Sequence, residues 1–245
     1  MKPVTLTETA EVFGDTPDVR LLWQSEQIKA IYADIIQALN ERTPLLKVIA
    51  DAGTGKTLLC RKMFFSLKAH ASRYDVDLLP YPAIEAAELK IRLAGLSDSR
   101  HSVILIDEAQ AVSNDALLVI SKHLAKNDNL SLLMFGQPLL EERLATAKLA
   151  RLSEILQKCY HLRALTREET EQYILARLAL AGFTPEGEWL STKVIESIYS
   201  LSHGVPRVIN TLMRRSAAIA SQSEAAGIEL AHLQQASNTL ELQYV

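Results

Sequence analysis

The chain has 245 residues, a net charge of −3, 48% hydrophobic residues and 22% charged residues. These values are typical of a folded globular protein, and they exclude a strongly basic module for nucleic acid or anionic membranes. The cysteines, Cys60 and Cys159, stand in unrelated apolar settings, which favours free thiols over a disulfide framework. There is no signal peptide and no run of about 18 apolar residues. We therefore expect a cytoplasmic protein without a membrane span of its own.

Helices and strands alternate through the first two thirds of the chain. Apolar periodicity predicts helices over 25–40, 56–67, 83–94, 114–125 and 138–146. Short apolar runs predict strands over 45–50, 76–79, 102–106, 130–135 and 160–162. The nearly unbroken apolar runs at 102–106 and 130–135 are typical of parallel strands covered on both faces. The alternation predicts an α/β domain over residues 1–163, a parallel sheet between two layers of helices.

The pattern changes after residue 163. Thr166 and Glu169 form a capping box, and no strand interrupts the helices predicted over 167–181, 189–201, 206–221 and 229–237. Residues 164–245 are therefore expected to form a separate all-helical domain. They carry six Lys/Arg and nine Asp/Glu, so the chain totals of 26 and 29 leave 20 of each for residues 1–163. Neither domain is basic, and DNA is an improbable partner for either.

Residues 50–57 read Ala-Asp-Ala-Gly-Thr-Gly-Lys-Thr, between a predicted strand and a predicted helix. This is the phosphate-binding pattern G-x-x-x-x-G-K-[ST] with Ala50 in place of the first glycine. We expect Lys56 to neutralise the β- and γ-phosphates of a nucleoside triphosphate and Thr57 to bind Mg²⁺. The remaining predicted nucleotide-binding residues are Ala52, Gly53, Thr54, Gly55 and Leu58. Ala50 is tolerable if its φ is negative. The alternative is a glycine-rich turn that contains Lys-Thr by chance.

Polar residues follow two of the other predicted strands. Asp107 and Glu108 come directly after 102–106, at the carboxyl end where open α/β sheets bind ligands. Asp107 is placed to hold Mg²⁺ and Glu108 to polarise the attacking water, although both acids suit a helix cap as well. Gln137 follows 130–135, where its amide can reach the γ-phosphate or the water. Its alternative is an exposed residue before a helix that starts at Pro138.

Several segments, in order over nearly the whole chain, resemble the ExeA/GspA/MshM-type AAA+ ATPases of bacterial type II secretion and type IV (MSHA) pilus systems. The matching segments are 105–110, 136–144, 160–162, 165–170 and 202–210. The resemblance implies an AAA+ P-loop fold with a small helical lid, ATP hydrolysis to ADP and phosphate with Mg²⁺, and a nucleotide-dependent homo-oligomer. It also implies a partner in secretion or pilus assembly.

The resemblance assigns further roles to single residues. Gln137 would be the sensor-1 residue, and Arg207 in the lid would be the sensor-2 arginine that faces the γ-phosphate; otherwise Arg207 is a surface residue. AAA+ proteins also use an arginine finger on a neighbouring subunit's nucleotide. Where relatives carry Gln-Arg-Ile, this chain reads Glu-Ile-Leu at 154–156. The finger is then Arg151 or Arg143, or it is missing.

Two other functions compete with this interpretation. DNA-transposition regulators of the TniB/TnsC type share the Asp-Glu-Ala-Gln signature, but the acidic balance of the chain argues against duplex binding. A nucleotide-gated scaffold with little turnover would follow from a missing finger. The six histidines show no metal-ligand spacing with each other or with the cysteines, so we expect no metal site beyond the Mg²⁺ that accompanies the nucleotide.

Overall fold

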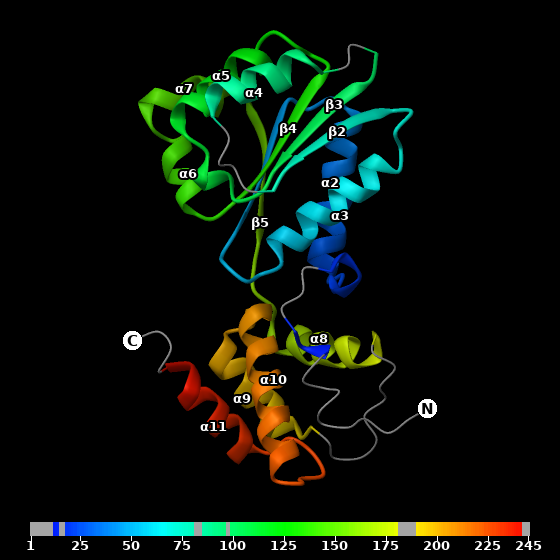
Figure 1. Cartoon of the computed structure of the whole chain (residues 1–245), viewed down its shortest axis with the longest axis vertical. Helices are drawn as coiled ribbons and strands as arrows, with labels where there is room; N and C mark the ends of the chain where they lie inside the picture. Colours follow the sequence, from blue (N-terminus) through cyan, green and yellow to red (C-terminus); the bar gives the residue numbers. More distant parts are fainter. Residues whose placement is uncertain (1–11, 15–17, 81–84, 97–98, 181–189, 242–245) are drawn as a thin grey trace. The chain divides into compact units, whose positions relative to one another are not determined.

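A computed structural model describes residues 12–14, 18–80, 85–96, 99–180 and 190–241. Their contacts divide the chain into two compact units (Figure 1). The α/β unit comprises Gln24–Ala52 and Lys56–Arg163. The helical unit comprises the described residues from Ala164 onward, Gly53–Gly55, and Trp23 with the described residues before it.

The α/β unit is built on a five-stranded parallel sheet with the order β2-β3-β4-β1-β5. The strands are β1 (Leu45–Ala50), β2 (Tyr74–Leu79), β3 (His101–Ile106), β4 (Leu130–Gly136) and β5 (Leu156–Leu162). Every residue of β1, β3 and β4 is buried, as expected for central strands covered on both faces. Because β4 lies between β3 and β1, the segments that follow these three strands emerge side by side at one edge of the sheet.

Helices cover both faces of the sheet, α2 and α3 on one side and α4 to α7 on the other (Figure 1). Their bounds are α2 (Glu26–Asn40), α3 (Lys56–Lys68), α4 (Ala86–Ala94), α5 (Asn114–Leu124), α6 (Leu139–Leu144) and α7 (Ala150–Ile155), with short 3-10 turns η2 (Ala109–Ala111) and η3 (Ala147–Leu149). Ser25 and Ser113 cap α2 and α5 by accepting hydrogen bonds from backbone N–H groups three residues later. The core between the sheet and α4–α7 includes Ile106, Leu117 and Met134.

The helical unit contains η1 (Val19–Leu21), α8 (Arg167–Leu180), α9 (Thr192–Ser202), α10 (Pro206–Gln222) and α11 (Leu230–Glu241). The predicted capping box forms: Glu169 N–H donates to Thr166 Oγ1 and Thr166 N–H donates to the Glu169 carboxylate. Phe13 is fully buried among these helices, and the Arg177 guanidinium lies 5.7 Å from its ring centroid. Phe13, with Val12 packed against it, therefore contributes to the core of this unit.

The largest difference from the predicted elements concerns the last strand. The sequence predicted 160–162, whereas β5 begins at Leu156 directly after α7, a helix that the sequence analysis did not predict. β5 is an edge strand whose residues alternate between half-buried and exposed, so its first part carries polar residues. Similarly, β2 begins two residues before the predicted 76–79. The first residues of the helices predicted at 83–94 and 189–201 fall outside the described residues. None of the described helices is long and apolar enough to cross a membrane.

Candidate active site

The loop after β1 has the backbone that the phosphate-binding pattern requires. Gly53 and Gly55 have φ of +85° and +102°, a region that glycine enters at little cost. Ala50 is the last residue of β1, is 3% exposed and is absent from the positive-φ positions. The predicted condition for tolerating Ala50 is met, because this position is extended strand and needs no glycine.

The first turn of α3 meets the end of β3. Lys56 is only 4% exposed, and its Nζ lies 3.3 Å from Glu108 Oε1. The Thr57 hydroxyl donates to the Asp107 carboxylate. Four predicted site residues from two separate motifs are thus in direct contact within the α/β unit.

The two carboxylates differ in their electrostatics. Burial raises the pKa of Asp107, against hydrogen bonds from the Thr57 hydroxyl and the Glu108 N–H. Burial also acts to raise the pKa of Glu108, but hydrogen bonds from Gln110 and Gln137 and the Lys56 charge lower it overall. Glu108 is therefore ionised at neutral pH, as a proton acceptor must be. Asp107 is a desolvated carboxylate that a nearby cation would stabilise.

Glu108 has a left-handed backbone conformation, with φ 50° and ψ 41°. Such a conformation costs a non-glycine residue about 1–3 kcal/mol and persists only where surrounding contacts fix it. Here Gln110 Nε2 donates to Glu108 Oε2 over 2.5 Å, and Gln137 Nε2 donates to the same oxygen over 3.3 Å. Together with Lys56, these amides hold the carboxylate at the carboxyl ends of β3 and β4.

Gln110 is a site residue that the sequence analysis named only as part of a family motif. Besides donating to Glu108, it accepts a hydrogen bond at Oε1 from the Gln137 N–H over 3.1 Å. One side chain thereby bridges the residues that follow β3 and β4. The available signal was its residue type, a glutamine two positions after the candidate base, which is too common to single out alone.

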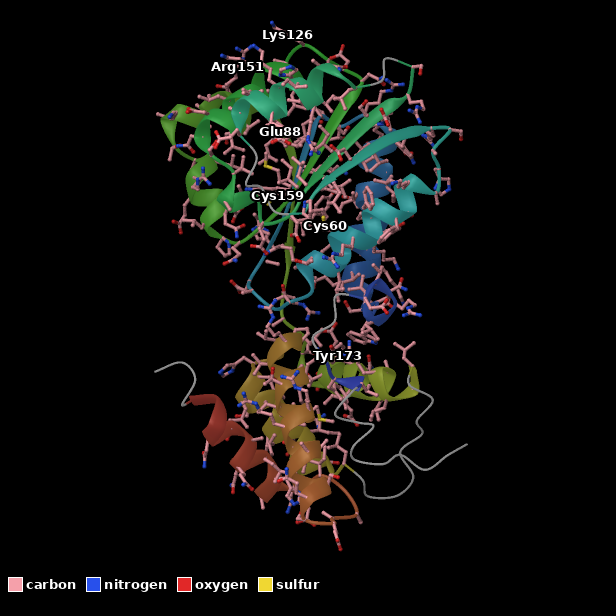
Figure 2. All side chains as sticks on the ribbon, viewed as in Figure 1. Cys60, Glu88, Lys126, Arg151, Cys159 and Tyr173 are labelled. Atoms are coloured by element: carbon pink, nitrogen blue, oxygen red, sulfur yellow. The ribbon has the colours of Figure 1, made fainter. Side chains whose placement is uncertain are left out.

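The two arginine-finger candidates occupy different settings in the α/β unit. Arg143 of α6 donates to the backbone oxygens of Gln110 and Val112 and to Asn114 Oδ1, so its guanidinium fixes the loop after β3. Arg151 is exposed on α7 (Figure 2), and its side chain has no hydrogen bond or ion pair within the described parts of the chain. Because α7 precedes β5, Arg151 lies toward the amino end of that strand. Neither arginine joins the cluster around Lys56 within one chain.

The remaining predicted nucleotide-binding residues lie along the loop and beyond. Ala52 is exposed, Thr54 is 5% exposed and Leu58 is half-buried in the first turn of α3. Arg207 is exposed in the first turn of α10, and its N–H donates to the Gly53 oxygen over 3.1 Å within the helical unit. A Cβ on Gly53 would lie 2.8 Å from the Arg207 Cβ, so close approach as well as positive φ requires glycine there.

Comparison with known sequences gives a relative among secretion proteins. No family model matches the chain. General secretion pathway protein A of Aeromonas hydrophila is 27% identical, in an alignment covering 83% of this chain and 42% of that protein. The chain therefore spans less than half the length of this relative. The match agrees with the resemblance inferred from the motifs.

Comparison with solved structures concerns the fold. The Aeropyrum pernix ORC1 protein, solved in complex with DNA, matches with a TM-score of 0.68 and 17% identity over 95% of this chain and 69% of that one. Thermotoga maritima RuvB matches with a TM-score of 0.62 and 18% identity over 89% of this chain and 70% of that one. The chain thus has the predicted AAA+ P-loop fold, a parallel αβα sandwich followed by a small all-helical domain, and it resembles the ExeA/GspA-type AAA+ ATPases.

Proposed function

We propose that the chain binds Mg·ATP and hydrolyses it to ADP and phosphate. The observation that carries the proposal is the hydrogen bond from Thr57 to the buried Asp107 carboxylate, beside the buried Lys56 ammonium. A hydroxyl and a carboxylate offer the oxygen ligands that Mg²⁺ prefers. A lysine at a helix start, after a loop with two left-handed glycines, suits a polyphosphate. The AAA+ fold supports the same assignment.

Each site residue then has a role. Backbone N–H groups of the loop and the start of α3 receive the phosphates, and Lys56 neutralises their charge. Thr57 and Asp107 would hold Mg²⁺, which supplies positive charge at the β- and γ-phosphates when bound. Glu108 accepts a proton from the attacking water. Gln137 donates from its amide to the γ-phosphate or to that water.

The contact between Lys56 and Glu108 links phosphate binding to the base. The distance of 3.3 Å between Lys56 Nζ and Glu108 Oε1 is longer than in an ideal charge-assisted hydrogen bond. The Glu108 carboxylate also accepts hydrogen bonds from two side-chain amides. Phosphate oxygens compete with Glu108 for Lys56, because they carry more negative charge. In this proposal ATP binding releases the Glu108 carboxylate from the lysine, while Gln110 and Gln137 keep it in place.

Turnover would also need cations besides the Lys56 ammonium. We assign Arg207 to sensing the γ-phosphate and Arg151 to acting on the nucleotide of a neighbouring copy, since Arg143 is already engaged by the loop after β3. A cation at the transferring phosphoryl group stabilises the charge that develops there. The chain would therefore assemble into a nucleotide-dependent homo-oligomer. A nucleotide-gated scaffold is the outcome if no finger acts.

The proposed biological setting rests on the sequence relative and on the motif resemblance. General secretion pathway protein A supports a role in bacterial secretion, and the motif resemblance extends this to pilus assembly. We accordingly propose a cytoplasmic ATPase that serves a secretion or pilus assembly protein. Because the alignment covers 42% of that relative, the proposal concerns the aligned part and not the whole relative.

The deciding experiment replaces Glu108 with Gln in the full chain. Glu108→Gln should keep Mg²⁺-dependent ATP binding, measured by calorimetry, and lose phosphate release by about 100-fold or more, because general-base catalysis contributes about that much. Glu142→Gln, an exposed glutamate of α6, is the matched control and should keep the wild-type rate. Wild-type hydrolysis by Glu108→Gln, or no ATP binding by the unmodified chain, would refute the proposal.

A second measurement separates the enzyme from the scaffold. Single-turnover hydrolysis is followed across a protein-concentration series, for the wild type and for Arg151→Ala. Rates that rise with concentration in the wild type only would show that Arg151 acts between copies. A flat and very slow rate in both, with intact ATP binding, would favour the scaffold.

A further inference from the structure

A second polar cluster lies on the open face of β5, outside the residues assigned to the nucleotide. It consists of Glu141 from α6 and of Cys159 and His161 from β5, the last two exposed. Residues two apart on a strand project from the same face, and Figure 2 places Cys159 on this strand. The sequence analysis expected Cys159 in an apolar setting and no metal site beyond Mg²⁺. The structure corrects the first expectation, because Cys159 is exposed beside a carboxylate and an imidazole.

The sheet register holds this cluster together. β5 pairs with β1 so that Cys159 lies opposite Lys47, and His161 lies opposite Ile49. Lys47 is 7% exposed, and its Nζ donates to Glu141 Oε1 over 2.6 Å. The buried lysine therefore fixes the Glu141 carboxylate above β5 and leaves Oε2 directed to His161, whose Nε2 lies 3.2 Å away.

The distances in the cluster match those between ligands of one metal ion. Cys159 Sγ lies 3.5 Å from Glu141 Oε1 and 3.9 to 4.0 Å from the two ring nitrogens of His161. One ligand atom from each residue lies within 4.8 Å of the other two. In a tetrahedral zinc site, with Zn–S and Zn–N/O bonds of their usual lengths, ligand atoms stand about 3.4–3.6 Å apart. Small side-chain rotations reconcile the two sets of distances.

We propose that Glu141, Cys159 and His161 bind a zinc ion, with water in the fourth position. Cysteine and histidine are the ligands that Zn²⁺ prefers, whereas the Mg²⁺ of the nucleotide site prefers oxygen. Binding replaces the thiol proton of Cys159 by the metal, and the proton leaves to solvent. The fourth position is open because Cys159 and His161 both face solvent.

In the proposed site Lys47 does not bind the metal but orients one of its ligands, Glu141. Ligating carboxylates are themselves held by hydrogen bonds that orient them, and Lys47 provides one to Glu141 Oε1. Zinc would join α6 to the edge strand β5. The same helix carries Arg143, which fixes the loop after β3, so the ion would brace a helix that already contacts the candidate active site.

The test uses the full chain, reduced and freed of metal, titrated with Zn²⁺ against a chromophoric chelator and with Co²⁺ by absorbance. We expect one ion per chain, a thiolate-to-cobalt charge-transfer band, and a zinc-induced rise in melting temperature. Cys159→Ser should abolish the band and, like His161→Gln and Glu141→Gln, weaken zinc binding by about 10-fold or more. None of these readouts depends on ATP, so the result is independent of the proposed function.

Matched variants control the test. Cys60 is fully buried in α3 and stays in every variant, and His70→Gln removes an exposed histidine elsewhere. Urea unfolding in EDTA shows whether each variant folds. Equal zinc affinity in wild type and Cys159→Ser, or loss of affinity in His70→Gln alone, would overturn the site. One zinc per two chains with a zinc-dependent dimer would also overturn it, because the ligands would then come from different copies.

Discussion

The described part of the α/β unit contains two buried lysines, each beside a glutamate, and a comparison of the two Lys–Glu pairs shows how such a pair can differ in role. Lys56 lies 3.3 Å from Glu108, and Lys47 lies 2.6 Å from Glu141. The lysine side chains are 5% and 9% exposed, while the glutamates are 30% and 36% exposed. The two pairs are thus almost equally buried, and they differ in the distance between the lysine Nζ and the carboxylate oxygen.

The difference lies in what else holds each carboxylate. Glu108 is retained by Gln110 and Gln137 in a left-handed backbone conformation, so its contact with Lys56 is one of several. Glu141 relies on the short contact with Lys47, which with His161 lowers its pKa to about 2. Under the proposed function, Lys56 can exchange its looser contact with Glu108 for a phosphate oxygen, whereas the tighter contact of Lys47 with Glu141 joins α6 to the sheet.

The largest expected effect separates the pairs by ligand affinity. Lys56→Met should weaken Mg·ATP binding by about 100-fold, because a charged hydrogen-bond donor to phosphate contributes roughly 1.5–3 kcal/mol. Among the described residues the other buried lysine is Lys47, and its ammonium donates to Glu141. Lys47→Met should leave ATP affinity within about 2-fold of the wild type, since the Lys47 ammonium donates to Glu141 and not to a residue of the candidate nucleotide site. Calorimetric titration of both variants decides the matter. Similar losses of ATP affinity in the two variants would contradict the assignment of Lys56, and not Lys47, to nucleotide binding.

A third titratable side chain, His101, sharpens the contrast because it faces arginines rather than a carboxylate. His101 is 6% exposed, and burial together with the charges of Arg42 and Arg73 lowers its pKa to about 4. The unfolded chain takes up this proton near pH 6.5, whereas the folded chain does so only near pH 4. The free energy of unfolding is therefore unaffected by the titration of His101 above about pH 6.5, and it decreases as the pH falls toward 4. Between pH 7 and 5 the expected decrease is about 2 kcal/mol.

Urea unfolding of wild type and His101→Gln across this range measures the effect. The variant lacks the titrating ring, so its stability should change less between pH 7 and 5 than that of the wild type. Restricting the range to pH 5 and above keeps the Glu141 carboxylate ionised in the folded chain. Parallel pH curves for the two proteins would contradict the assignment.

The sequence singled out Lys56 and Glu108 as separate site residues, without predicting their contact, and it singled out neither Lys47 nor Glu141. Lys56 and Glu108 each belong to a short contiguous motif whose spacing is set by one loop and one strand end. Lys47 and Glu141 are 94 residues apart, and only the pairing of β5 with β1 brings Cys159 to them. No local pattern encodes that register, because β5 is a polar edge strand of which only 160–162 was predicted.

The same reasoning explains the other successes and failures. The alternating strands, the capping box at Thr166 and the tolerance of Ala50 follow from local periodicity and backbone geometry, and the structure agrees with each. The bridging role of Gln110 depends on the left-handed backbone conformation of Glu108, which cannot be predicted from the residue type. Likewise, Arg143 becomes a loop support only because α6 lies against η2.

A smaller effect should separate the two pairs by stability. Lys47→Met leaves Glu141 without its short contact, but that carboxylate is 36% exposed and can rehydrate, so we expect a loss of about 1–2 kcal/mol rather than the larger cost of a fully buried pair. Lys56→Met should cost about 1 kcal/mol or less, because Glu108 keeps its amide donors. Urea unfolding in EDTA measures both. A larger loss in Lys56→Met would reverse our interpretation of which pair is structural.

The smallest predicted effect tests whether Glu108 is held by its amides rather than by Lys56. Gln110→Ala removes the bridge to Glu108 Oε2 and to the Gln137 N–H, and it should lower the ATP turnover number by about 5- to 10-fold, or roughly 1 kcal/mol in the barrier. The KM for ATP should change little, since the side-chain hydrogen bonds of Gln110 go to Glu108 and Gln137 and not to the proposed phosphate-binding loop. Gln234→Ala, an exposed glutamine of α11, is the matched control. A change in KM with an unaltered turnover number would mean that Gln110 acts on nucleotide binding instead, and Lys56 would then be the main support of the base.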